Sequence, residues 1–140
     1  MKYLLDTCLI SELVKKTPNT KVTAWLARQD EDKIYLSVLT IGELQKGISK
    51  LADTGKKEKL QSWLTNDLVF RFERRILSID TEIAAQWGEL NGQAERHGKK
   101  FPVIDSLIAA TATVHNLTVV TRNTRDLEEC QVKVLNPWKN

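Results

Sequence analysis

Apolar residues in this chain occur in two kinds of run, short continuous segments and longer stripes with helical spacing. The short segments predict buried strands at residues 3–5, 34–38, 76–79, 118–121 and 132–135. The stripes repeat apolar residues at steps of three and four, and they predict helices at about residues 9–14, 20–28, 40–51, 56–72, 83–97, 102–115 and 124–129. Strands that alternate with helices indicate a parallel sheet covered by helices on both faces. We therefore predict a single α/β domain over residues 1–140.

Two consecutive helices, predicted at residues 40–51 and 56–72, exceed what one crossover between parallel strands needs. The turn residues Asp53, Thr54 and Gly55 separate them. We expect the pair to project from the sheet as a helical hairpin and to offer a surface to a partner.

Composition places the chain among ordinary globular proteins, with 41% hydrophobic and 28% charged residues. The net charge of +3 permits a nucleic-acid partner without requiring one. Two cysteines, Cys8 and Cys130, are too few for a disulfide framework, so we expect reduced thiols. Asp6 interrupts the apolar start, which argues against a signal peptide, and no run reaches the ~18 apolar residues of a membrane helix. These features predict a cytoplasmic protein without a membrane segment.

Acidic residues stand where the predicted elements meet. Asp6 follows the first strand and Asp126 follows the fourth. Glu43 lies early in the third helix, and Asp105 lies just after Pro102 at the head of another. Because the carboxyl ends of parallel strands share one edge, we expect these acids to meet in one crevice. Several carboxylates stay ionised together only when a cation sits between them. Oxygen ligands without a Cys/His cluster favour Mg²⁺ or Mn²⁺, and we predict a metal-dependent enzyme acting on phosphate esters.

Most of these acids also have a simpler structural interpretation. Asp6 is suited to cap the helix that follows it. Thr40 and Glu43 have the spacing of a capping box. Asp126 is placed to flank neighbouring arginines on the surface. Asp105 is harder to explain in this way, because a partly buried carboxylate in the most apolar helix needs a counter-charge or donors.

Four segments of the chain carry a family resemblance. They resemble the motifs of PIN-domain ribonucleases, and most closely those of VapC-type toxins of bacterial toxin–antitoxin pairs, in the FitB-like branch. The similarity covers nearly the whole chain in the same order. The segments are residues 4–13 (LLDTCLISEL), 39–44 (LTIGEL), 104–110 (IDSLIAA) and 119–127 (VVTRNTRDL).

The resemblance implies a three-layer α/β/α fold with a central parallel sheet of four to five strands. It implies an endoribonuclease that depends on Mg²⁺ or Mn²⁺ and cleaves RNA phosphodiester bonds with a metal-activated water. Asp6, Glu43 and Asp105 match the metal-binding acids of the family. The fourth acidic position stays open between Asp126 and Asn123, where some relatives carry Asp.

The resemblance also implies partners. Family members are usually homodimers, and a cognate antitoxin places its C-terminal segment in the active-site groove. A larger assembly of toxin, antitoxin and DNA is a further expectation. Which RNA such a nuclease cleaves does not follow from the sequence.

Polar and aromatic residues near the acids have candidate roles in catalysis and RNA binding. The candidates for orienting water or phosphate are Thr7, Thr121, Asn123 and Ser106, and a helix cap is the alternative role for each hydroxyl. The candidates for RNA binding are Lys46, Lys50, Arg122 and Arg125, with solvated surface charge as the alternative. Four tryptophans are able to stack on bases, but packing is the expected role of the three on apolar stripes, which are Trp25, Trp63 and Trp87. Cys8 stands where many relatives carry Asn or Ser, which alters the pocket wall.

Two other functions compete with the nuclease. A receiver domain would be phosphorylated on Asp80 and would use Asp6 in its metal pocket and Thr121 as a switch. The sequence disfavours it, because only one acid follows the first strand and Asp80 is suited to cap the next helix. A non-catalytic nucleic-acid-binding module would tolerate replacement of the acids.

Overall fold

Five parallel strands form the centre of the protein, as the alternation of strands and helices predicts. The computed structural model describes residues 1–139. The strands lie in the order β3-β2-β1-β4-β5, and every neighbouring pair is parallel. Their bounds are β1 (Tyr3–Leu5), β2 (Ile34–Ser37), β3 (Ile76–Leu77), β4 (Thr118–Val120) and β5 (Val134–Leu135).

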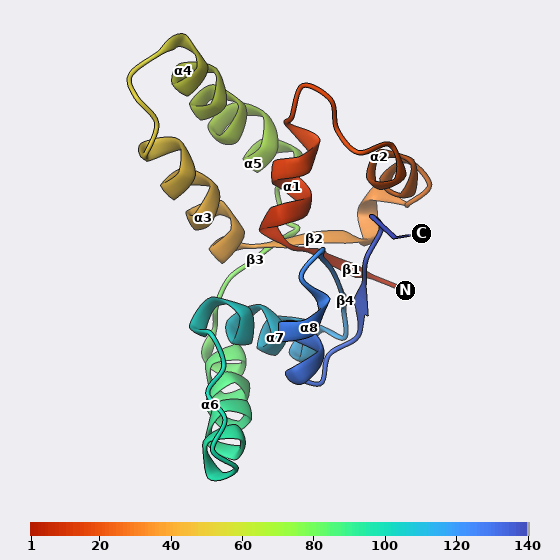
Figure 1. Ribbon diagram of the computed structural model, residues 1–140, viewed down its shortest axis with the longest axis vertical. Coiled ribbons are helices and arrows are strands. Elements are labelled where there is room, and N and C mark those ends of the chain that lie inside the picture. The colour runs from red at the N-terminus through yellow and green to blue at the C-terminus, as the bar shows by residue number, and fades with distance from the viewer. Residues whose placement is uncertain (140) are drawn as a thin grey trace.

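Helices cover both faces of the sheet and complete a three-layer α/β/α fold (Figure 1). One face carries α1 (Thr7–Leu13), α2 (Thr20–Ala27), α3 (Val38–Ser49), α4 (Gly55–Ser62), the π-helix η2 (Trp63–Leu68) and α5 (Val69–Arg71). The other face carries α6 (Thr81–Arg96), α7 (Val103–His115) and α8 (Thr124–Glu129). A short 3₁₀-helix, η1 (Glu31–Lys33), leads into β2.

The central strands are buried on both sides, which explains their continuous apolar runs. Successive side chains of a strand point to opposite faces. Leu5 and Val120 therefore belong to the core beneath α1, α2 and α3, while Leu4 and Val119 belong to the core beneath α7 and α8.

Several helix ends follow from local chemistry. Asn116 ends α7 in the left-handed conformation, with φ of 55°, which asparagine tolerates better than most residues. Asp80 caps α6 by accepting a hydrogen bond from the backbone N–H of Ile83 at 2.9 Å. The predicted capping box of Thr40 and Glu43 is wrong. Helix α3 begins earlier, because the Ser37 hydroxyl accepts from the backbone N–H of Leu39 at 3.0 Å and serves as its N-cap.

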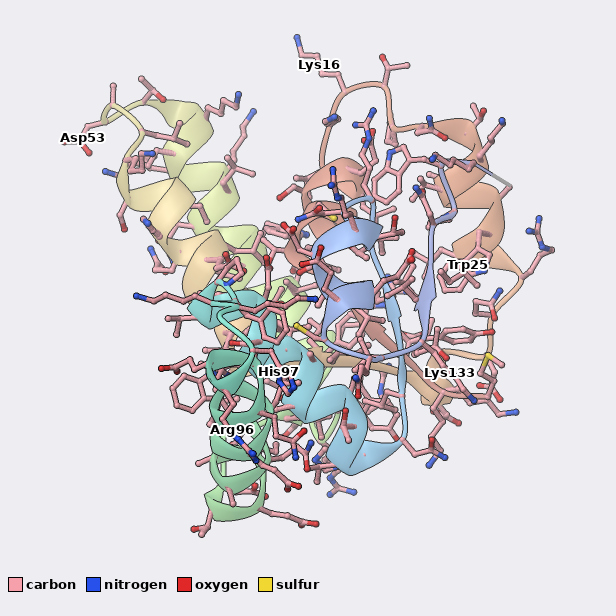
Figure 2. All side chains as sticks on the ribbon, turned by 60° about the horizontal axis from the view of Figure 1, so that its bottom comes forward. Lys16, Trp25, Asp53, Arg96, His97 and Lys133 are labelled. Atoms are coloured by element: carbon pink, nitrogen blue, oxygen red, sulfur yellow. The ribbon has the colours of Figure 1, made fainter. Side chains whose placement is uncertain are left out.

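The predicted helical hairpin is present, and it runs from α3 through α4 and η2 to α5 (Figure 1). Gln45 and Gln61 join its two arms through reciprocal amide hydrogen bonds of 2.7 and 2.9 Å. Asp53 lies exposed at the tip of the hairpin, and Lys16 projects from the loop between α1 and α2 (Figure 2). Within residues 1–139, no helix combines the length and apolar character needed to cross a membrane.

Candidate active site

The candidate site lies where the strand order reverses. Chain order runs outward from β1 in both directions, through β2 to β3 and through β4 to β5. Open α/β sheets bind ligands at such a switch point, beyond the carboxyl ends of the strands. Leu5 pairs with Val120 in register, and the Asp6 N–H donates to the Val120 carbonyl at 3.0 Å. This pairing brings Asp6 beside Thr121, 115 residues away in the sequence.

Asp6 is a helix cap and a site residue at once. Its Oδ1 accepts from the backbone N–H of Thr7 at 2.9 Å, which caps α1. Its Oδ2 accepts from the Thr121 hydroxyl at 2.9 Å. The two structural roles use different oxygens, so the carboxylate is held in one orientation with unused lone pairs toward the cavity.

Glu43 is also oriented by a threonine. The Thr7 hydroxyl donates to Glu43 Oε1 at 2.6 Å, a length typical of a charge-assisted bond to a carboxylate. The buried hydroxyl of Thr40 lies 3.4 Å from the same Thr7 oxygen. Thr7 therefore links the first turn of α1 to α3, and it holds Glu43 close to Asp6.

A cavity of about 380 Å³ contains the predicted acids. It opens at the switch point between α1, α3 and α7. Three carboxylates, one hydroxyl, one thiol, one cation and one amide line it, and they are Asp6, Thr7, Cys8, Glu43, Asp105, Arg122 and Asn123. The structure thus gathers side chains from four separate segments into one polar pocket.

Asp105 is the acid most affected by its surroundings. It lies in the first turn of α7 and is half-buried. Burial raises its pKa above the ordinary range, and the carboxylates of Asp6, Asp126 and Glu43 raise it further. Among residues 1–139 no group donates a hydrogen bond to its carboxylate. A cation in the cavity would relieve both effects.

Asn123 and Asp126 stand at the fourth acidic position as a pair. Asn123 lines the cavity, and its side-chain N–H donates to Asp126 Oδ2 at 3.0 Å. The Asn123 backbone N–H donates to the Thr121 hydroxyl at 3.0 Å. Asp126 is not among the residues that line the cavity, and its charge contributes to the raised pKa of Asp105.

Cys8 forms a neutral part of the wall. Its sulfur lies 3.5 Å from the Thr121 hydroxyl oxygen and accepts from the backbone N–H of Arg122 at 3.5 Å. Burial is the main reason that the pKa of its thiol is raised, and the charge of Asp6 adds to it. The thiol is therefore protonated at neutral pH and leaves the negative charge of the cavity to the acids.

The donor set of the cavity suits a hard divalent ion. Within residues 1–139, no three acidic, histidine or cysteine side chains converge tightly enough to surround one ion by themselves. Mg²⁺ usually keeps several waters and binds through one or two carboxylates together with substrate phosphates. Asp6, Glu43 and Asp105 each keep carboxylate lone pairs that no hydrogen bond occupies, so all three are able to contact an ion in the cavity.

Some candidate residues lie outside the cavity. Ser106 was expected near the reacting groups, but its buried hydroxyl accepts from the Trp87 indole at 2.9 Å and donates to the Val103 carbonyl at 3.0 Å. It joins α6 to α7 instead. Arg125 is exposed on α8 and does not line the pocket.

Lys46 and Lys50 line a neighbouring groove of about 500 Å³ along α3. This groove and the acidic cavity have Glu43 as a common lining residue, so the two adjoin at that side chain. Its floor is apolar, with Val38, Leu39 and Ile104.

The receiver interpretation is wrong. In the receiver-like strand order 2-1-3-4-5, the third strand lies inside the sheet and its end reaches the switch point. Here β3 is an edge strand, and Asp80 is an exposed helix cap outside the acidic cavity.

Comparisons with known proteins identify the family of the chain. The PIN domain matches residues 3–132. The chain belongs to the PIN-domain family. It is 40% identical to "Toxin FitB" of Neisseria gonorrhoeae, over 96% of this chain and 97% of that protein. It is 33% identical to "VapC ribonuclease Y4jK" of Sinorhizobium fredii, over 97% of each. The solved structure of FitAB bound to the IR36 DNA fragment contains a chain that superposes with a TM-score of 0.91 and 38% identity, over 97% of this chain and 95% of that one.

The sequence-based prediction gave no role to Glu12 and treated Trp138 only as one of four tryptophans able to stack on bases. Glu12 is a buried carboxylate in α1, 5% exposed, and Trp138 donates its indole N–H to Glu12 at 3.3 Å. The only local signal was an apolar Trp138 outside every predicted element, just after Asn136 and Pro137. Its partner lies 126 residues away, which local patterns do not encode.

Proposed function

We propose that this protein is a metal-dependent endoribonuclease and the toxin of a toxin–antitoxin pair, acting in the cytoplasm. The observation that carries the proposal is the shared cavity of Asp6, Glu43 and Asp105 at the switch point of the sheet. The ribonuclease and toxin names of its relatives support the same activity. A bound Mg²⁺ or Mn²⁺ would lower the pKa of a water and offset charge on the phosphoryl oxygens.

The residues of the chain have distinct tasks in this proposal. Asp6, Glu43 and Asp105 would hold the cation through their carboxylates. Thr121 and Thr7 keep the carboxylates of Asp6 and Glu43 in fixed orientations, which reduces the cost of assembling the site when substrate binds. Asn123 presents an amide to the cavity in place of a fourth acid.

RNA would approach along α3. Single-stranded RNA needs cations for its phosphates and open surface for its bases. The groove beside the cavity offers Lys46 and Lys50, with Gly42 and Gly47 leaving its wall free of side chains. Arg122 offers a further cation at the rim of the cavity itself.

An antitoxin is the proposed protein partner, and a homodimer is the proposed form of the toxin. The solved FitAB complex bound to a DNA fragment supports an assembly of toxin, antitoxin and DNA. A second groove, about 600 Å³, lies between α1, α2 and η2 and is lined mainly by apolar residues such as Leu13, Val14, Leu26 and Trp63. We assign this groove to an apolar helix of the antitoxin, with the adjoining chain reaching the acidic cavity.

The test is cleavage of a single-stranded RNA by the purified chain and by Asp105→Asn, with and without EDTA. The wild-type chain is expected to cleave, and the variant or chelation is expected to reduce the rate by about a thousandfold or more. Cleavage that survives both treatments would reject the assignment. RNA binding without cleavage by the wild-type chain would instead favour the non-catalytic binding module.

A further inference from the structure

Arg122 is a cation at the rim of the acidic cavity that forms no ion pair with the acids. Its side chain lines the cavity together with Asp6, Glu43 and Asp105. In residues 1–139 none of the salt bridges includes Arg122. Its guanidinium carbon instead lies 5.7 Å from the ring centre of Trp138, within the range of cation–π attraction.

Hydrogen bonds and core packing hold Trp138 in place. Its indole N–H donates to Glu12 Oε1 at 3.3 Å, and its backbone N–H donates to Asn136 Oδ1 at 2.9 Å. Its ring packs against the core beneath α1. Glu12 is buried, and it also accepts from Lys15 Nζ and from the backbone N–H of Asn19, each at 3.0 Å. The ring therefore has a fixed place beneath the arginine.

The position of Arg122 has a consequence for the acids. A guanidinium that turned toward the cavity would form charge-assisted hydrogen bonds with Asp6 or Asp105. Such a pair would occupy the oxygens that a divalent ion needs, and it would take the cation away from the RNA phosphate. An arginine held on an aromatic ring at the rim avoids both losses.

We propose that Trp138 is a positioning residue, which keeps Arg122 away from the cavity carboxylates and available to the substrate phosphate. The part of this proposal in which Arg122 binds the substrate phosphate rests on the proposed ribonuclease function. The part in which Trp138 keeps Arg122 away from the carboxylates does not, because it concerns only the competition between Arg122 and a divalent ion for the same oxygens.

Mn²⁺ binding to the purified chain, measured by calorimetry without RNA, separates this role from a structural one. Trp138→Leu is expected to weaken Mn²⁺ binding about two- to fivefold, since the released arginine competes with the ion. Trp138→Phe keeps a ring beneath Arg122 and is expected to bind Mn²⁺ like the wild-type chain. In the double variant Trp138→Leu/Arg122→Gln, the affinity is expected to return to that of Arg122→Gln alone.

The rescue is the decisive comparison. The double variant also carries Leu in place of Trp138, so any damage to the fold caused by the loss of the indole would persist in it. A double variant that binds Mn²⁺ as weakly as Trp138→Leu would overturn the proposal, and so would unchanged binding by Trp138→Leu. Thermal unfolding of the wild-type chain and the four variants confirms that each is folded at the temperature of the titration.

Affinity for a short single-stranded RNA in EDTA gives a second readout. Trp138→Leu and Arg122→Gln are each expected to weaken RNA binding, and the double variant is expected to bind RNA no more weakly than Arg122→Gln alone. If the losses of RNA affinity caused by Trp138→Leu and Arg122→Gln add up in the double variant, Trp138 does not act through Arg122. RNA cleavage that Asp105→Asn fails to abolish would reject the nuclease assignment alone, because neither Trp138 nor Arg122 changes in that comparison.

Discussion

The Thr121 hydroxyl donates to Asp6 Oδ2 at 2.9 Å, across the junction of β1 and β4. Asp6 is the first residue after β1, and Thr121 is the first after β4. The bond exists because the two strands are neighbours in register. It gives the carboxylate a fixed orientation at the point where the proposed ion binds.

Replacing Thr121 with Val removes this donor with little change of shape. We expect the free energy of unfolding to fall by about 1–2 kcal/mol, because the bond joins a buried hydroxyl to a charged group. Mn²⁺ affinity is also expected to fall, since the Asp6 carboxylate then loses one of the two hydrogen bonds that fix its orientation. Urea denaturation and calorimetry measure the two effects.

Thr113→Val is a matched control for that change. The Thr113 hydroxyl donates only to the Ala109 carbonyl of its own helix, and the residue is exposed. Its replacement is expected to change stability by less than about 0.5 kcal/mol and to leave Mn²⁺ binding unchanged. An equal decrease in both variants would show that Thr121 has no particular part in the site.

Asp105→Asn is expected to raise the Tm of the metal-free protein at neutral pH. The pKa of Asp105 is raised in the folded state, first by burial and then by neighbouring carboxylates. Its ionised form therefore destabilises the fold above the folded-state pKa. The penalty is absent below the unfolded-state pKa of about 4, so the difference between the two chains should shrink as the pH falls toward that value. Thermal unfolding in EDTA across this pH range provides the measurement.

Added Mg²⁺ should reverse the order of stability of these two chains. A ligand that binds only the folded state raises Tm, and the wild-type chain has the more complete site. Asp67→Asn serves as the control, because Asp67 is exposed in η2, outside the acidic cavity. A destabilising effect of Asp105→Asn in EDTA would contradict the repulsion among the acids.

Charge removal along α3 tests the proposed path of RNA. The double variant Lys46→Gln/Lys50→Gln is expected to raise KM for a single-stranded RNA while kcat changes little. The slope of log affinity against log salt should become shallower by about 0.7 for each RNA phosphate that the variant no longer neutralises. Lys16→Gln removes the same kind of charge from the distant loop seen in Figure 2, and it should alter neither quantity. Equal effects of the two changes would indicate only a response to net charge.

The groove between α1, α2 and η2 provides a test of the antitoxin assignment. Val14 lines this groove and is 40% exposed, so Val14→Asp should leave the fold intact. A charge there opposes burial against an apolar helix. Co-expression with the cognate antitoxin is expected to yield free toxin from this variant and complex from the wild-type chain. RNA cleavage by the isolated variant should remain at the wild-type rate. If Val14→Asp still forms the complex with the antitoxin, the antitoxin does not bind in this groove.

Local patterns determined much of this protein. The period of the apolar residues placed all five strands and most helices, because each element must bury one face or both. Capping chemistry identified Asp80 at a helix end. The family motifs named the acids that the cavity contains. The capping box of Thr40 and Glu43 failed because Ser37, three residues earlier, caps α3 first.

Tertiary structure decided which side chains meet. Strand order is a property of the whole sheet, and it alone places β3 at an edge and Thr121 beside Asp6. The bond from Thr7 to Glu43 and the position of Trp138 beneath Arg122 join residues far apart in the chain. Periodicity and capping depend on neighbours within a few residues, so a single sequence determines its elements, whereas the contacts between them exist only once the sheet has assembled.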